Sequence, residues 1–169
     1  MEMKTTPSIR MGEWAVAQDD GVLRMLLGSC IGLALYDLTH QVAGLAHVVL
    51  PRSPGDTDVP GKFVDTAVPV LLTEMKRLVG RTIMPTARIV GGANMFATDV
   101  VRTIGQQNIE ASEQVLEQMG IPIVGRHCGG EKGRRMTVNT TSGLITIEIV
   151  GEDPVELHHK PAHAQVRHG

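Results

Sequence analysis

Residues 22–50 read VLRMLLGSCIGLALYDLTHQVAGLAHVVL, and this stretch decides the fold. Its apolar, strand-forming residues fall into three runs, at positions 22–27, 31–36 and 42–50. The polar stretch between the second and third runs suits a hairpin, which would place Cys30 and His47 on neighbouring strands. We therefore predict a β-rich amino-terminal part in which these two side chains can meet.

Two helices are expected after these strands. Apolar residues recur every four positions over 63–79, which predicts a helix that ends at Gly80. Pro69 fits only near the first turn of a helix, so this helix should begin there or be kinked at its start. A second helix is predicted with Asn108 as its cap and Gly120 at its end.

The later strands and the two ends complete the predicted organisation. Strands are expected at residues 87–90, 121–125, 135–139 and 144–150, the last two as a hairpin. This order of elements favours a single α+β domain at 14–151, preceded by an amino-terminal segment at 1–13. The tail at 152–169 carries four histidines, loses all periodicity and is predicted to be disordered.

Composition excludes several classes of partner. Sixteen basic and eighteen acidic residues give a formal charge of −2, and the chain has only one Trp, one Tyr and two Phe, so no nucleic-acid partner is expected. Residues 1–12 lack the apolar run of a signal peptide, and no later run reaches the length of a membrane span. We expect a cytoplasmic protein without direct membrane insertion, whose two cysteines, Cys30 and Cys128, are free thiols.

The sequence Gly28-Ser29-Cys30-Ile31-Gly32 is the strongest local signal for chemistry. Glycines on both sides permit a sharp turn after a strand, and such a turn exposes the thiol and aims neighbouring N–H groups at one point. Cys30 is therefore the candidate nucleophile, and Gly28, Ser29 and Gly32 are the candidate turn and oxyanion-hole residues. The alternative is that the glycines only permit a β-bulge.

His47 interrupts an otherwise apolar run and therefore needs a polar partner. A backbone carbonyl is the more common partner of a buried histidine, but here the Cys30 thiol is the nearest candidate. A free thiol with a pKa near about 8.5 is only about 3% ionised at pH 7, and a neighbouring imidazolium lowers that pKa. The pair can attack a carboxamide, release ammonia from the resulting intermediate, and hydrolyse the thioester that remains.

Two of these segments, LGSCIGLALYD and GLAHVVLP, resemble the chemoreceptor glutamine deamidase family CheD of bacterial chemotaxis. Further motifs of that family follow in order, GGANMF, IGQQN, and GGEKGRRM leading to NTTSG, so the resemblance covers residues 14–150. It implies a mixed β-sandwich flanked by helices, and hydrolysis of glutamines on methyl-accepting chemotaxis receptors to glutamates. It also implies binding to the phosphatase CheC, with Cys30 as nucleophile and His47 as its catalytic partner.

One position departs from the family pattern. Members of the family can carry a threonine six residues before the cysteine as a third catalytic residue, and this chain has Arg24 there. Ser29, Ser53 or a backbone carbonyl could orient the imidazole instead. The sequence leaves these alternatives open.

Three other groups of residues are set aside. The glycine-rich stretch 129–133 lacks the spacing of a phosphate-binding P-loop and is expected to be a solvated turn. No Cys or His cluster has the spacing of a zinc site, so no metal or other cofactor is expected, although the tail histidines could bind a metal adventitiously. Cys128 follows His127, but adjacent residues of a strand point to opposite faces, so Cys128 is expected to be inert.

Two other functions are weighed against deamidation. The glycine-flanked cysteine could form the nucleophile elbow of an α/β-hydrolase for small esters, although that fold is usually longer and its histidine comes later in the chain. A non-catalytic adaptor that binds another chemotaxis protein is compatible with the arginine at position 24. The substitution Cys30→Ala separates these classes, because an enzyme loses ammonia release and an adaptor keeps its effect on the partner.

Overall fold

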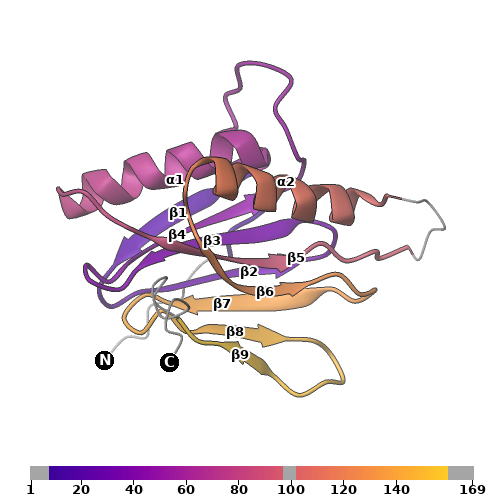
Figure 1. Ribbon diagram of the computed structural model, residues 1–169. Coiled ribbons are helices and arrows are strands. Elements are labelled where there is room, and N and C mark those ends of the chain that lie inside the picture. Colours follow the sequence, from indigo (N-terminus) through magenta and orange to yellow (C-terminus); the bar gives the residue numbers. More distant parts are fainter. Residues whose placement is uncertain (1–7, 97–101, 160–169) are drawn as a thin grey trace, which may run out of the picture.

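The computed structural model describes residues 8–96 and 102–159, which form two β-sheets and two α-helices (Figure 1). The first sheet has the strand order β1-β4-β3-β5-β6, and the second has the order β2-β7-β8-β9. The strands are β1 (Trp14–Gln18), β2 (Val22–Leu27), β3 (Ile31–Asp37), β4 (Val42–Val48), β5 (Thr86–Gly91), β6 (Ile123–Cys128), β7 (Arg134–Asn139), β8 (Ile145–Glu148) and β9 (Val155–Leu157). The helices are α1 (Val64–Val79) and α2 (Ile104–Gln118), and a short 3-10 helix, η1 (Pro60–Lys62), precedes α1. This arrangement confirms the predicted α+β fold.

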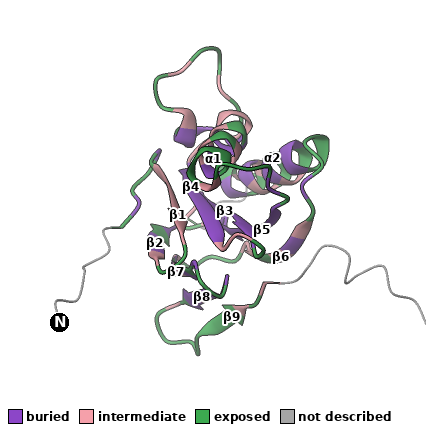
Figure 2. Ribbon diagram, turned by 90° about the vertical axis from the view of Figure 1, so that its left-hand side faces the viewer, coloured by how far each residue is buried: buried purple, intermediate pink, exposed green. Residues whose placement is uncertain are grey.

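The β3–β4 hairpin predicted from the sequence is the centre of the first sheet. The strands pair antiparallel, from Ile31 opposite Val48 to Asp37 opposite Val42. Gln41 in the turn has a φ of 46°, which is the left-handed conformation common in tight turns. Every residue of both strands is buried (Figure 2), because the helices cover one face of the sheet and the second sheet covers the other.

The first sheet separates two hydrophobic cores. Side chains alternate along β3, so that Leu33 and Leu35 pack with the helices while Ala34 and Tyr36 pack with the second sheet. Figures 1 and 2 show the same layering, with α1 and α2 on one side of the first sheet and β7, β8 and β9 on the other. Helices, first sheet and second sheet are therefore three successive layers.

Both helices depart from the prediction at their amino ends. Helix α1 begins at Val64 and continues through Pro69, so the predicted start at this residue is wrong. Gly80 ends α1 in the left-handed conformation, with a φ of 76°. Helix α2 is capped by Thr103, whose side chain forms a reciprocal capping box with Gln106. Asn108, predicted as the cap, instead lies inside α2 and is buried.

The ends of the described chain join the sheets. Strand β1 pairs with β4, and Ser8 forms a β-bridge with Arg24. The prediction of a disordered tail is wrong for residues 152–159, because β9 pairs with β8 and the Leu157 carbonyl accepts a hydrogen bond from Arg88 Nη1 at 3.0 Å. The rest of that tail lies outside the described residues. Within the described ranges, no helix combines the length and the apolar character needed to cross a membrane.

Candidate active site

Cys30 stands at the end of the short turn that carries the chain from the second sheet into the first. The turn follows β2, and Cys30 directly precedes β3. The segment after β5 holds this turn, because the N–H groups of Ala93 and Gly92 donate to the carbonyls of Gly28 and Cys30 at 3.0 and 2.9 Å. The Cys30 side chain packs into the core between the sheets and is 7% exposed.

His47 lies on β4 directly opposite Gly32 of β3. Cys30 lies just before β3, and its side chain packs in the core between the sheets. Alternation along β4 directs His47 to the same core, together with Ala43 and Leu45. Gly32 leaves the position opposite the imidazole without a side chain, and no hydrogen bond joins Cys30 to His47 within the described part of the chain.

The imidazole of His47 is oriented by the segment before β1. Nδ1 lies 2.9 Å from the carbonyl oxygen of Ile9, in a buried contact. A carbonyl can only accept, so Nδ1 carries the proton and Nε2 of the neutral ring is free to act as a base. The Ile9 N–H donates in turn to the Arg24 carbonyl at 2.8 Å. A backbone carbonyl, one of the alternatives left open by the sequence, therefore holds the ring.

Arg24 does not take part in this contact with its side chain. It alternates along β2 with the buried Leu23 and Met25 and is itself exposed. Its side chain therefore points away from the core that contains Cys30 and His47.

Burial shifts both members of the pair toward their neutral forms. It raises the pKa of the Cys30 thiol. It also lowers the pKa of His47, against the smaller opposing effects of the hydrogen bond to Ile9 and the charge of Glu13. Burial thus favours the neutral thiol of Cys30 and the neutral imidazole of His47, opposite in direction to the lowering of the thiol pKa that an imidazolium would cause.

The turn around Cys30 presents free donors. The carbonyls of Gly28 and Cys30 accept the backbone bonds described above, and the Ser29 carbonyl accepts from the side chain of Asn108 at 3.2 Å. By contrast, the N–H groups of Ser29 and Cys30 donate to none of the residues that the structure describes. These N–H groups are thus available for an anionic oxygen near the sulfur.

The second thiol lies elsewhere and has no imidazole partner among the residues that the structure describes. Cys128 Sγ donates to the Ile89 carbonyl at 3.3 Å in the helix-side core, and burial raises its pKa to about 11. Nδ1 of His127 instead accepts a hydrogen bond from Arg134 Nη1 at 2.8 Å. The adjacent Cys128 and His127 therefore do not form a second thiol–imidazole pair.

The glycine-rich turn at 129–133 is held by Arg134. Its guanidinium donates to the carbonyls of His127, Gly129 and Lys132, so the arginine is occupied by the turn itself. No cluster of three or more His, Cys, Asp or Glu side chains that could hold a metal ion occurs in the described ranges.

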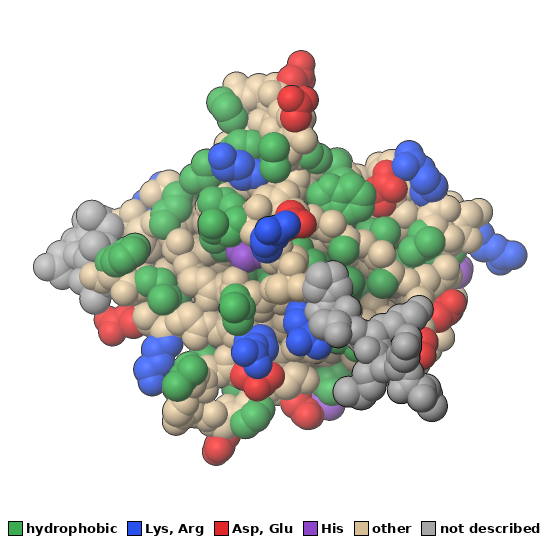
Figure 3. All heavy atoms as spheres, turned by 180° about the vertical axis from the view of Figure 1, so that it is seen from behind, with side chains coloured by type: hydrophobic (Ala, Val, Ile, Leu, Met, Phe, Trp, Pro, Cys, Tyr) green, Lys and Arg blue, Asp and Glu red, His purple; other side chains and the backbone are tan. Residues whose placement is uncertain are grey.

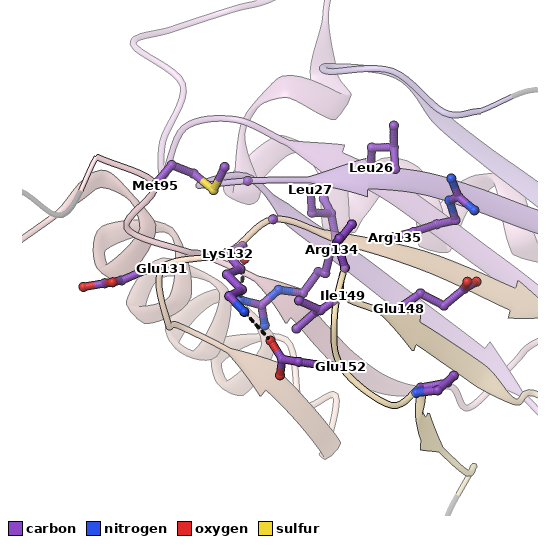
Figure 4. A pocket seen from close by; sticks show the side chains of 14 residues that line it. Leu26, Leu27, Met95, Glu131, Lys132, Arg134, Arg135, Glu148, Ile149 and Glu152 are labelled. Carbon is purple, nitrogen blue, oxygen red and sulfur yellow. Dashed lines mark hydrogen bonds and ion pairs between the residues drawn. The ribbon is translucent and has the colours of Figure 1, made fainter.

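A pocket of about 860 Å³ lies beside the cysteine turn (Figure 4). Gly28 contributes to its wall, together with Leu26 and Met95, whereas Cys30 and His47 do not. Lys132 and Glu152 point toward one another across it and form an ion pair at 3.3 Å. The pocket therefore adjoins the candidate site without containing the pair.

The loop between β4 and α1 projects from the molecule on the side of the helices (Figure 1). Figure 3 shows acidic side chains at the tip of this projection, where Asp56 and Asp58 are exposed. The tip of this loop is therefore exposed and acidic.

An α+β protein with a buried thiol and an oriented imidazole on one face of its central sheet fits the class of small thiol hydrolases. Comparison with known proteins is more specific, because the model of the family described as CheD chemotactic sensory transduction matches residues 49–149. That range begins after His47, but individual relatives match most of the chain. The chain belongs to the CheD family.

Three relatives illustrate the extent of the similarity. The chemoreceptor glutamine deamidase CheD of Thermotoga maritima is 38% identical over 144 residues, which cover 85% of this chain and 91% of the relative. The probable chemoreceptor glutamine deamidase CheD of Desulforamulus reducens is 39% identical over 140 residues, with 80% and 84% covered. The corresponding protein of Clostridium novyi is 42% identical over 130 residues, with 74% and 80% covered.

Proposed function

We propose that this protein deamidates glutamine side chains of chemoreceptors, with Cys30 as the nucleophile and His47 as its general base. Membership of the CheD family supports the reaction and the substrate. The observation that carries the assignment of residues is the hydrogen bond from His47 Nδ1 to the Ile9 carbonyl, because it leaves Nε2 as a base on the sheet face that Cys30 shares.

The first half of the reaction forms a thioester. His47 Nε2 takes the proton of the Cys30 thiol as sulfur attacks the carboxamide carbon, so a neutral pair is a suitable starting state. The carbonyl oxygen of the substrate becomes an anion, which the free N–H groups of Ser29 and Cys30 can stabilise. The imidazolium then gives its proton to the departing nitrogen, and ammonia leaves as the C–N bond breaks.

The second half consumes water. His47 Nε2 removes a proton from a water molecule that attacks the thioester carbon, and the C–S bond then breaks. The sulfur regains the proton from the imidazolium, and the substrate leaves as glutamate. The net reaction replaces NH2 by OH and needs neither a metal nor a redox cofactor.

The surroundings of the turn suit a protein substrate. Cys30 is only 7% exposed, so a slender side chain such as glutamine must reach in to meet the sulfur. Leu26 and Met95, which line the pocket beside the turn, are 61% and 47% exposed, and exposed apolar side chains of this kind are typical of a surface for another protein. On the family resemblance we also propose the phosphatase CheC as a partner and the cytoplasm as the location.

Intact mass spectrometry of a purified chemoreceptor cytoplasmic domain tests this function. Incubation with the wild-type protein should add about one dalton for each glutamine hydrolysed through the acyl-enzyme. Cys30→Ala and His47→Ala should abolish the shift, whereas Cys128→Ala, the matched thiol control, should retain it. Absence of any shift with a wild-type protein that binds the receptor would favour the adaptor instead.

A further inference from the structure

Asn108 is a buried polar residue that the proposed mechanism does not use. It lies inside helix α2 with no exposed surface. Its Nδ2 donates to the carbonyl of Ser29 at 3.2 Å and to the carbonyl of Val49 at 2.9 Å. Ser29 immediately precedes Cys30, and Val49 follows His47 by two residues. One carboxamide therefore bridges the two segments that carry the thiol and the imidazole.

The Ser29 carbonyl depends on this side chain in a way that its neighbours do not. The carbonyls of Gly28 and Cys30 accept hydrogen bonds from backbone N–H groups. Any residue other than proline at the donor positions would supply such an N–H group. The Ser29 carbonyl has its hydrogen bond from Asn108, so the middle of the turn is fixed by the identity of a residue on a separate helix.

The carboxamide is also not explained by stability alone. Its Oδ1 is buried and has no hydrogen-bond partner among the described residues, which is unfavourable for folding. The contacts that it does make are both donated by Nδ2 and both reach the candidate site. The buried Asn108 side chain thus leaves its acceptor Oδ1 unpaired, while its donor Nδ2 joins the two segments that carry Cys30 and His47.

We propose that Asn108 is a positioning residue that sets the placement of the Cys30 thiol relative to the His47 imidazole. It touches neither the substrate nor the reacting atoms, and it acts by tying the Ser29 carbonyl to the Val49 carbonyl. This role rests on the proposed function only where deamidation is the readout. The reactivity of the Cys30 thiol toward a small reagent measures the positioning role of Asn108 without any receptor.

The variants follow from the contacts. Asn108→Leu keeps a similar shape and removes both donated hydrogen bonds. Asn108→Asp keeps the shape and, as a neutral acid in a buried site, can donate one of them. Ser112→Ala is the matched control, because the Ser112 hydroxyl is equally buried on the same helix and donates to the Asn108 backbone carbonyl at 2.7 Å without reaching the turn.

The first readout is the rate of Cys30 alkylation by iodoacetamide as a function of pH, followed by mass spectrometry in the Cys128→Ala background. We expect one limb of the wild-type pH profile, a change of the alkylation rate with pH, to depend on His47. This limb is identified by its loss in His47→Ala. Asn108→Leu should lose this limb, Asn108→Asp should keep part of it, and Ser112→Ala should match the wild type.

The second readout is receptor deamidation. Asn108→Leu should lower kcat by about 100-fold, as expected for a small misplacement of reacting groups, with KM unchanged because Asn108 does not face the substrate. Asn108→Asp should fall between this variant and the wild type.

Wild-type alkylation profiles in folded Asn108→Leu and Asn108→Asp proteins would overturn the role of Asn108. An equal effect of Ser112→Ala would do the same, since it would mean that any loss of a buried hydrogen bond on α2 suffices. Should Asn108→Leu fail to fold, the comparison of Asn108→Asp with Ser112→Ala decides. Failure of the wild type to deamidate receptor would refute the proposed function and leave the alkylation test intact.

Discussion

A methyl group at position 32 would force neighbouring side chains of the core between the sheets to move. A Cβ on Gly32 would lie 2.5 Å from Met136 Sδ and 3.0 Å from both Leu27 Cδ1 and Met25 Sδ. We expect Gly32→Ala to lower the free energy of unfolding by about 1–3 kcal/mol through overpacking and to reduce kcat by pushing the sheets apart beside His47. Urea unfolding and deamidation rates measure the two effects. The control is Gly55→Ala, because nothing lies within 4 Å of a Cβ there, and an equal effect of both substitutions would contradict the prediction.

The protonation of His47 predicts how activity depends on pH. The ring is a base only when neutral, and burial holds its pKa below the ordinary value of about 6.5. The acid limb of kcat/KM should therefore be centred below about pH 6.5. A limb centred above that value, measured between about pH 4.5 and 8, would contradict His47 as the buried base.

The same shift affects stability. In acid the unfolded chain binds a proton at position 47 more readily than the folded one, so the free energy of unfolding falls as pH drops below about 6.5 and levels off below the folded pKa. His47→Gln should lack this component of the acid destabilisation, as measured by urea unfolding at several pH values.

At the scale of elements, the segment before β1 acts as a strap between the sheets. Ile9 accepts from His47 and donates to Arg24 of β2, so it connects the imidazole to the second sheet. Removal of residues 1–9 should release the ring and lower kcat by about 100-fold. Removal of residues 1–7, which leaves Ile9 in place, should have little effect. Equal kcat values for the two shortened chains would show that the Ile9 carbonyl does not orient the base.

The elements that were predicted and those that were missed differ in how far apart in the sequence the residues that determine them lie. The β3–β4 hairpin was predictable because its runs are apolar, long and joined by a short polar turn. Strand β9 has only three residues without a clear alternation of burial, so it left no pattern in the sequence. Asn108 is a good cap by local preference, and only its contacts with distant Ser29 and Val49 explain why it lies inside α2.

The candidate site was predictable to a similar extent. Cys30 stood out through its flanking glycines and His47 through its apolar surroundings, and both are local signals. The partner of the imidazole was not, because the Ile9 carbonyl is a backbone group that any residue supplies, and its position depends on how the strap crosses β2 and β4. The spacing of Thr103 and Gln106 was a usable signal for the start of α2.

At the scale of the whole molecule, the site lies where the layers are joined. The cysteine turn connects the second sheet to the first, the strap fixes the imidazole from the amino-terminal side, and α2 reaches both segments through Asn108. Three parts of the chain that are distant in sequence thus converge on one thiol and one imidazole. The chemistry proposed here therefore depends on the complete fold rather than on a single motif.

The identity of the nucleophile is tested most directly by trapping the acyl-enzyme. Wild-type protein mixed with a chemoreceptor cytoplasmic domain is quenched in acid during turnover, digested and searched by mass spectrometry for a receptor glutamyl group in thioester linkage. We predict the adduct on Cys30 alone, with none in Cys30→Ala and an undiminished yield in Cys128→Ala. An adduct on Cys128, or receptor deamidation that persists in Cys30→Ala, would contradict the central role given to Cys30.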